Sequence, residues 1–309
     1  MKTPSARLYC LLARDARVGV VFRRGPTRQV LLIRWNLEND TFQEGEWFKG
    51  RIYERRCDLS PKGDKLIYFA ATYKEPLFTW TAISKPPWLT AIALWPKGDG
   101  WNGGGYFESD DSIVLNHPPE QAKGHDESDT TGIRITAYAP YIGEDDTVHH
   151  HLLHRSGWKF IQNVAWEKQP IKPREDLASL LKTYGIDYTP DPFWSEKGFI
   201  AEQPEVWCKQ HPGGQLSLRM SLHGLGKKNQ NWYDLYFAIT DQQGGEHSDL
   251  GPLDWAEWDS NGDLLFARKG CLFRVKVAEH QLQSEVLIAD FNDRTFQVLE
   301  SPEEARRWQ

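Results

Sequence analysis

Short runs of β-branched, aromatic and aliphatic residues recur along the whole chain, and most of them end in Gly, Pro, Asn or Asp. Such runs are typical of β-strands, and the residues that end them are typical of tight turns. We expect strands over residues 18–22, 30–35, 66–71, 90–95, 133–138, 216–220, 235–239, 264–267 and 271–277. The pattern therefore predicts a mostly β chain.

Four turn segments share one arrangement, in which glycine stands next to an apolar run. They are 60–64, 96–99, 212–215 and 259–263. Glycine suits hairpin turns because it adopts a positive φ without the steric penalty of a Cβ atom. The interval from Gly63 to Gly98 is 35 residues and that from Gly214 to Gly262 is 48. Periods of about 20–50 residues that hold several strands each favour propeller blades.

The closest internal match joins Leu59–Ile67 to Trp258–Phe266, where an apolar residue, a turn, Gly-Asp and an apolar strand follow one another. Here, and most clearly in Asp259–Val275, the chain resembles the β-propeller repeats of the WD40 and TolB-like kind, although the Gly-His and Trp-Asp signatures of WD40 repeats are absent. The resemblance implies an irregular propeller of about five to seven blades. We expect the N- and C-terminal strands to pair and close it, which would leave no exposed sheet edge. Two β-sandwich-like halves are the alternative.

Two segments have helical patterns. Pro173–Gly185 has proline and acidic residues in its first turn and apolar residues at helical spacing. In Ser301–Trp308, Ser301 is the expected N-cap and Glu304 completes a capping box. We therefore predict one closed propeller domain over 1–309, with a helical, Pro-rich insertion near 170–204.

Charge, hydropathy and cysteine spacing limit which partners and which compartment are expected for this protein. The chain has 37 basic and 43 acidic residues and a net charge of −6, so no general attraction to nucleic acid is expected. No apolar run approaches the length of a membrane span, so no membrane is expected either. The four cysteines lie far apart without metal-finger spacing, which predicts reduced thiols and a cytoplasmic protein.

A histidine cluster is the sharpest candidate for chemistry. His149, His150, His151 and His154 follow an acidic segment that ends in Asp146. On a helix, His150 and His154 would share one face and could bind a transition metal with Asp146 as third ligand. The alternative is a polar loop whose histidines face solvent.

The glycine-rich segment Gly98–Tyr106 lacks the Lys-Ser/Thr of a phosphate-binding loop. We interpret it as a flexible hairpin or connecting loop. Four of the fourteen tryptophans fall within residues 80–101, and aromatic rings are enriched at binding hot spots. We therefore predict a binding face that consists of Trp88, Trp95, Trp101, Asn102 and Tyr106. The even spread of the other tryptophans favours core packing.

Other acidic pairs indicate turns. Asp110-Asp111 fits a solvated turn better than a glycosidase pair. Asp259–Asp263 is similar to a calcium loop, but Gly270 stands where the twelfth-position Glu belongs. The sequence thus favours a non-catalytic propeller scaffold that binds a protein partner through loop aromatics and needs no cofactor. The alternatives are a metal-dependent hydrolase that uses His149–His154 and a lectin that uses Trp101 and Tyr106 for a glycan or small ligand.

Overall fold

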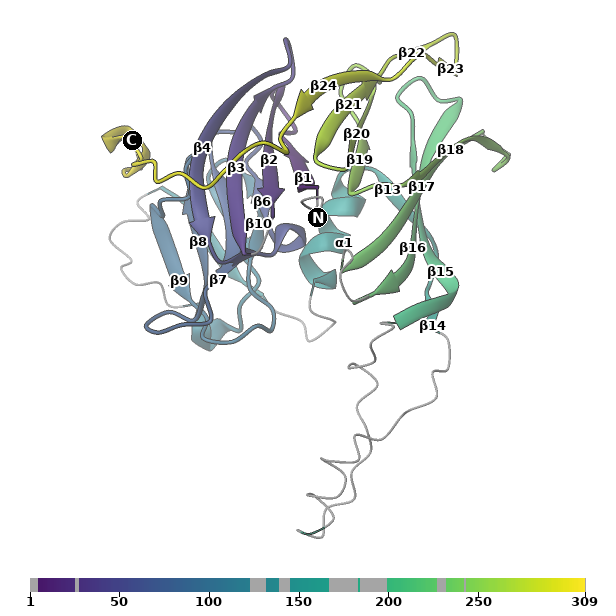
Figure 1. The fold of residues 1–309 in the computed structure, drawn as a ribbon. Helices are drawn as coiled ribbons and strands as arrows, with labels where there is room; N and C mark the ends of the chain where they lie inside the picture. The colour runs from purple at the N-terminus through teal and green to yellow at the C-terminus, as the bar shows by residue number, and fades with distance from the viewer. Residues whose placement is uncertain are drawn as a thin grey trace. The chain divides into compact units, whose positions relative to one another are not determined.

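The computed structural model describes residues 5–25, 28–122, 132–138, 145–166, 183, 199–226, 232–241 and 243–308 (Figure 1). The chain divides into two compact units, which are unit 1 (Met1–Trp158 with Asp254–Gln309) and unit 2 (Lys159–Leu253). Several antiparallel sheets dominate the described residues, which confirms the mostly β prediction. One closed domain over 1–309 stays a prediction.

Within the described residues, unit 1 contains four larger sheets, which we name in chain order. Sheet A consists of β1 (Arg7–Leu12), β2 (Val18–Arg24), β3 (Gln29–Asn36) and β4 (Thr41–Lys49). Sheet B consists of β5 (Arg51–Ile52), β6 (Asp58–Leu59), β7 (Leu66–Ala71), β8 (Thr79–Ser84) and β9 (Ala93–Pro96). Sheet C consists of β10 (Gly105–Ser109), β11 (Ser112–Leu115) and β12 (Arg134–Ala137), with β12 parallel to β11.

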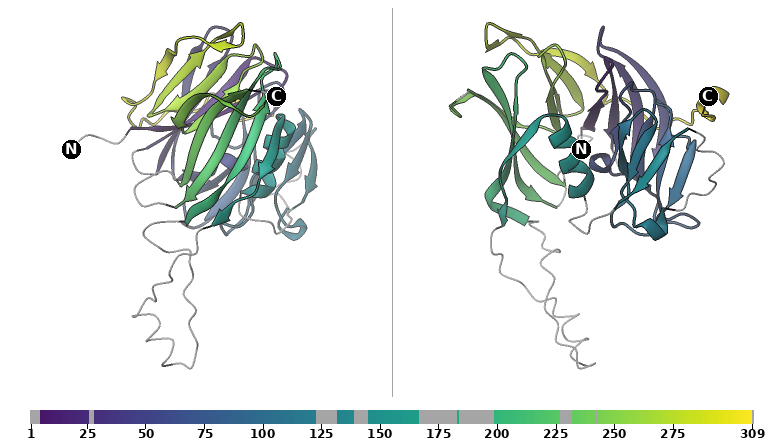
Figure 2. Two further views of the ribbon diagram at one scale, coloured as in Figure 1. Left: turned by 90° about the vertical axis from the view of Figure 1, so that its right-hand side faces the viewer. Right: turned by 180° about the vertical axis from the view of Figure 1, so that it is seen from behind.

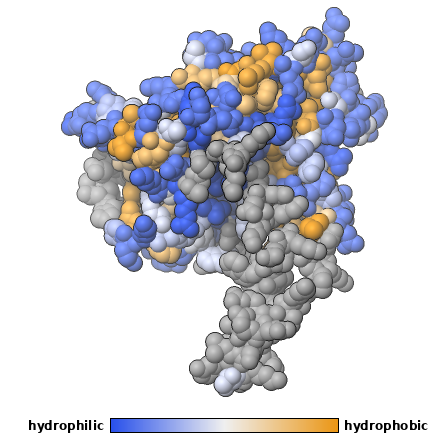
Figure 3. Space-filling view, viewed as in Figure 1, coloured by the Kyte–Doolittle hydropathy of each residue, from blue (hydrophilic) through white to orange (hydrophobic). Residues whose placement is uncertain are grey.

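Sheet E, the last of the four, consists of β19 (Trp255–Trp258), β20 (Leu264–Arg268), β21 (Cys271–Val275) and β24 (Val286–Asp290). A small hairpin, β22 (Val277–Ala278) with β23 (Gln281–Leu282), follows β21. In sheets A and E each strand pairs with the next strand of that sheet along the chain. Figure 3 shows a mixed polar surface, with apolar side chains gathered in the upper part of the view, where the edge strand β24 lies.

Both faces of sheet A are buried, because its strands carry apolar residues at successive positions. Val21 and Ile33 pack against sheet E in one core layer. Val20 and Leu32, one residue away on the same strands, pack against sheet B in another layer. Successive side chains of a strand point to opposite faces, so one strand supplies both layers.

Sheet B repeats this arrangement. Tyr68 of β7 packs in the layer with sheet A, whereas Ile67 packs with Phe107 and Ile113 of sheet C. The sheets of unit 1 are therefore stacked face to face in the order E, A, B, C. A sequence stretch that is apolar at nearly every position, such as Leu66–Ala71, fits a strand that is covered on both sides.

Unit 2 contains sheet D, with longer strands (Figure 2). It consists of β13 (Trp158–Gln162), β14 (Ala165–Trp166), β15 (Phe199–Gln210), β16 (Leu216–Leu225), β17 (Tyr233–Asp241) and β18 (Glu246–Pro252). The turn at Gly214 joins β15 to β16, as predicted from the sequence. The predicted helix at 173–185 and most of the Pro-rich segment 170–204 lie outside the described residues.

The described helix of ten residues, α1 (Asp146–Arg155), belongs to unit 1 and is held at both ends by arginine pairs. At its start, Asp145 pairs with Arg56 of the 3-10 turn η1 (Glu54–Arg56). At its end, Arg155 donates to both carboxylate oxygens of Asp58 at 2.8 and 2.7 Å. The helix is thereby fixed to the segment between β5 and β7.

The C-terminal segment 291–308 crosses sheets A and B instead of adding a strand (Figure 1). Phe296 packs on Trp47 of β4, Ser301 bonds to Thr90, and Trp308 packs in the layer between sheets B and C. We name this segment the C-terminal strap. Its path explains two errors of the sequence analysis.

The first error concerns the ends of the chain. The N-terminal strand β1 pairs with β2, and β24 pairs with β21, so the predicted pairing of terminal strands is wrong for the described residues. The second concerns 301–308, which form only a short 3-10 turn, η4 (Glu303–Ala305), without a side-chain cap. The Ser301 hydroxyl instead bonds to Thr90 and Arg306.

Two predicted turns are confirmed. The turns at 60–64 and 259–263 join β6 to β7 and β19 to β20. The acidic residues of the second turn surround Arg274, which bonds to Asp259 at 2.7 Å and Asp263 at 2.9 Å, so an arginine holds them in place. All four cysteines are free thiols. Among the described helices, none has the length and apolar character to cross a membrane.

Candidate functional site

The glycine-rich segment before β10 was predicted to be a flexible loop, but its second half is tightly packed. Gly103 and Gly104 adopt φ of +83° and +75°. A Cβ atom on Gly103 would lie 2.3 Å from the Phe69 ring, and one on Gly104 would lie 2.0 Å from the carbonyl oxygen of Arg56. Glycine is required here by close approach as well as by backbone conformation.

Arg56 organises this loop from inside the protein. Its side chain is fully buried, and Nη1 donates to the carbonyl oxygens of Gly100 at 2.7 Å and Asn102 at 2.5 Å. Its Nε donates to Asp145, and its guanidinium lies 4.6 Å from the ring centroid of Tyr53. Buried charges of this kind persist when ion pairs and hydrogen bonds satisfy them.

A chain of buried hydrogen bonds supports the same loop. The Gly104 amide donates to Thr81 Oγ1 at 2.7 Å, and Thr81 Oγ1 lies 2.8 Å from His117 Nε2. His117 Nδ1 lies 3.3 Å from the carbonyl oxygen of Gln121, which can only accept, so we assign the ring proton to Nδ1. Burial lowers the pKa of His117 to about 4. The neutral imidazole can therefore accept from Thr81.

The loop presents Trp101 to solvent from this fixed base. Trp101 is 65% exposed, and its amide donates to Asp99 Oδ1 at 2.8 Å. Lys97 Nζ lies 2.8 Å from each carboxylate oxygen of Asp99, which holds that acceptor in place. An exposed indole on an ordered loop loses little conformational entropy on binding.

Two further aromatic side chains lie beside this loop. Tyr73 and Phe78 are both more than one third exposed and form an edge-to-face pair at 5.2 Å. The loop is joined to their hairpin because the amides of Lys97 and Gly98 donate to the carbonyl oxygen of Thr79. We name Tyr73, Phe78 and Trp101 the aromatic patch.

The five predicted binding residues differ in their exposure to solvent. Trp95 is 2% exposed and packs in the layer between sheets B and C, and Asn102 is 5% exposed. Trp88 is half-buried. Tyr106 is half-buried and stacks on His151, with ring centroids 3.8 Å apart. Of the five, Trp101 is the most available to a partner.

The histidine segment is helical, as the metal hypothesis required, but the histidines face different surroundings. His149 is buried, and burial, together with Arg55 and His150, lowers its pKa well below the usual value. His154 is exposed. The side chain of Asp146, the predicted third ligand, is not among those that the structure describes. Within the described residues, no group of three His, Cys, Asp or Glu side chains could hold a metal.

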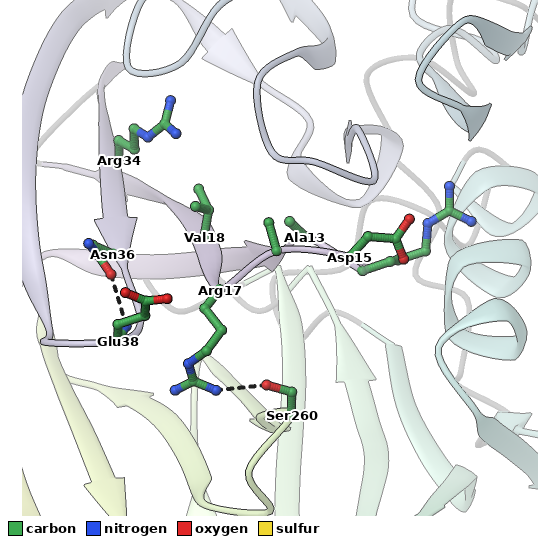
Figure 4. A pocket seen from close by; sticks show the side chains of 10 residues that line it. Ala13, Asp15, Arg17, Val18, Arg34, Asn36, Glu38 and Ser260 are labelled. Atoms are coloured by element: carbon green, nitrogen blue, oxygen red, sulfur yellow. Dashed lines mark hydrogen bonds between the residues drawn. The ribbon is translucent and has the colours of Figure 1, made fainter.

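A second feature of unit 1 is a hollow of about 690 Å³ that the sequence analysis did not identify (Figure 4). It is lined by the β1–β2 turn, the end of β3, the turn after β3 and the β19–β20 turn. Its volume falls within the range of about 300–1,000 Å³ that is usual for ligand pockets.

Strand alternation explains where the hollow lies. Val30 and Leu32 of β3 pack in the layer between sheets A and B, and Arg34 is the next residue on that face. On β2, Val20 packs in the same layer and Val18 lines the hollow. The hollow is therefore the end of this layer, where arginine replaces apolar side chains.

Three arginines line the hollow, but their guanidinium groups are bound differently. Arg17 donates to Ser260 Oγ at 2.7 Å, as Figure 4 shows. Arg14 donates to the carbonyl oxygen of Phe107 at 3.2 Å. The guanidinium of Arg34, which is half-buried, makes no hydrogen bond or ion pair with a described residue. An arginine inside the apolar run 30–35 was the sequence signal that could have identified this site.

Comparison with known proteins gives little further information: no protein-family model and no curated protein matches the chain. The structure search finds an uncharacterized protein from Listeria monocytogenes EGD-e, 12% identical, over 93% of this chain and 67% of that one, with a TM-score of 0.29. It also finds the beta-propeller domain of the Trilobed protease from Pyrococcus furiosus, 12% identical, over 97% of this chain and all of that one, with a TM-score of 0.33. Scores this low carry no argument about this chain.

Proposed function

We propose that the protein is a non-catalytic binding module built from propeller-type blades, and that it docks a protein partner through the aromatic patch. The observation that carries the proposal is the exposed Trp101 on a loop that Arg56 holds from inside. Aromatic anchors with a polar rim are typical of interface hot spots. Lys74, Glu75 and Asp99 supply such a rim beside the patch.

The stacking of the sheets supports the blade architecture. In a two-layer sandwich each sheet buries one face, whereas sheets A and B bury both. Face-to-face stacking of successive four-stranded sheets is the packing of propeller blades. The strand β1 also contacts β6 of sheet B and β19 and β20 of sheet E, as neighbouring inner strands do.

The order of the sheets adds a second argument. Sheet A comes from the start of the chain and sheet E from its end, yet they share one core layer. A ring places the first and last blades next to each other, so this contact favours a closed arrangement. Closure over the whole chain is part of the proposal.

The test is quantitative affinity capture from the native host, with wild type, Trp101→Ala and a control variant, Trp232→Ala, as baits. Trp232 is also exposed but lies in unit 2. We expect a protein that is captured by wild type and the control and is reduced about tenfold or more with Trp101→Ala, because a hot-spot tryptophan contributes about 2 kcal/mol or more. Matching near-UV circular dichroism would show that the variants are folded.

An identical captured set for wild type and Trp101→Ala would contradict the proposal. Binding to a glycan array that requires Trp101, without a captured protein, would favour the lectin alternative. Deletion of 100–105 is a poorer test, because it would remove the carbonyl groups that satisfy buried Arg56.

A further inference from the structure

We propose that the hollow at the end of sheets A and E binds a small molecule with an oxyanionic group, a phosphate or a carboxylate, and that Arg34 is its principal contact. The hollow is distinct from the aromatic patch, because none of the residues that line it belongs to the patch. The inference therefore stands independently of the proposed protein partner.

The position of Arg34 is the first argument. It follows Val30 and Leu32 on a strand face that is otherwise core. Arginine at such a position loses part of its hydration, and this cost is normally offset by an ion pair or hydrogen bonds. No described group offsets it here. A bound oxyanion would do so, because the planar guanidinium matches the two oxygens of a carboxylate or phosphate.

The neighbouring arginines are the second argument. Arg17 is fixed beside the hollow by Ser260 at 2.7 Å and by the carbonyl oxygen of Leu37 at 2.8 Å. Its charge is shared with Asp259, whose carboxylate lies 3.5 Å away. Arg14 is held by carbonyl groups of β10. These two positive charges are already oriented when a ligand arrives, and preorganised charges lower the cost of binding.

The acidic residues of the lining limit the size of the ligand. Asp15 and Glu38 line the hollow with exposed side chains. Two carboxylates would repel an extended polyanion such as a nucleic acid. They would tolerate a small ligand that places its anion against Arg34 and directs hydroxyl or amino donors toward the carboxylates.

Titration calorimetry with inorganic phosphate and with citrate tests the proposal on the full chain. The proteins to be titrated are wild type, Arg34→Met, Arg34→Lys and the control variant Arg268→Met. Arg268 is also half-buried on a strand but pairs with Glu285 outside the hollow. We expect at least one probe to bind wild type and the control, with affinity reduced about tenfold or more in Arg34→Met. Arg34→Lys should lie between, because it keeps the charge and loses the planar fork.

Thermal unfolding gives a second measurement. Without ligand, Arg34→Met should melt at or above the wild-type temperature, because a charge without a partner is replaced by an apolar side chain. Phosphate or citrate should raise the melting temperature of wild type and leave that of Arg34→Met unchanged. Sodium chloride at equal ionic strength should not reproduce the increase.

Three results would overturn the proposal. They are the absence of binding by both probes at millimolar concentration, equal binding by wild type and Arg34→Met, and equal stabilisation by sodium chloride. A ratio of phosphate to citrate affinity well above one would assign the site to phosphate compounds, and the reverse would assign it to carboxylates. Loss of protein capture by Trp101→Ala with unchanged phosphate binding would show that the two sites are separate.

Discussion

Arg56 and Arg34 occupy interior positions of unit 1 and have opposite surroundings. Arg56 is fully buried and bonds to Asp145 and to two carbonyl oxygens of the glycine-rich loop. Arg34 is half-buried and its guanidinium has no described partner. The comparison teaches that interior charge alone does not identify a binding site. A satisfied arginine holds structure, and an arginine without a partner is available to a ligand.

Replacing Arg56 should have the largest effect on the free energy of unfolding, and it should separate Arg56 most clearly from Arg34. Arg56→Met leaves Asp145 and the loop carbonyl groups without their donor, so we expect a loss of about 3–5 kcal/mol in the free energy of unfolding. Urea denaturation measures it. Arg34→Met should cost nothing by the same measurement. Arg51→Met is the matched control, because Arg51 also stacks on Tyr53. A loss below about 1 kcal/mol for Arg56→Met would contradict this account.

Gly104→Ala tests whether the loop is packed against Arg56. The added Cβ atom would lie 2.0 Å from the Arg56 carbonyl oxygen at a φ of +75°. We expect a loss of about 2–4 kcal/mol, from overpacking and left-handed strain together. Gly98→Ala is the control, because Gly98 has a φ of +81° with open space around it. It should cost only the strain, about 1–2 kcal/mol. Equal losses in both variants would show that packing contributes nothing.

Acidification should weaken the Arg56 region through His117. Burial lowers the pKa of His117 from 6.5 to about 4 in the folded protein, so the unfolded chain binds the proton first. Stability is therefore full above pH 6.5 and declines as the pH falls toward 4, by up to about 3 kcal/mol. Urea denaturation across this interval measures the decline.

His117→Gln should flatten part of that pH dependence. A residual slope is expected, because burial also lowers the pKa of His149. An unchanged slope in His117→Gln would exclude His117 as a source.

The sequence alone was sufficient for the local features. Turns at 60–64 and 259–263 were predictable because glycine and the polar residues beside it determine the backbone there. The helix around His149–His154 was anticipated only as a condition of the metal hypothesis. Features that depend on distant contacts were not predictable. Ser301 looks like an N-cap, but its hydroxyl bonds to Thr90, 211 residues away.

The candidate sites show the same limit. Trp95 and Trp101 were predicted to share one binding face, but one fills a core layer and the other is 65% exposed. Strand register and the neighbouring sheet decide that difference. Arg56 lies in a charged triplet, Glu54-Arg55-Arg56, which is typical of a surface turn. Its burial depends on Asp145 and on loop carbonyl groups that are distant in the sequence.

The contact between the first and the last sheet has a consequence for the newly made chain. Five of the thirteen buried residues in the core layer between sheets A and E come from sheet E, such as Leu265 and Leu272, or from the strap residue Phe291. These residues leave the ribosome long after sheet A does. Until sheet E is made, Val21, Ile33 and their neighbours have no packing partners, and this hydrophobic face of sheet A is exposed to solvent. We expect nascent chains halted before residue 254 to aggregate or to engage chaperones, whereas completed chains would not.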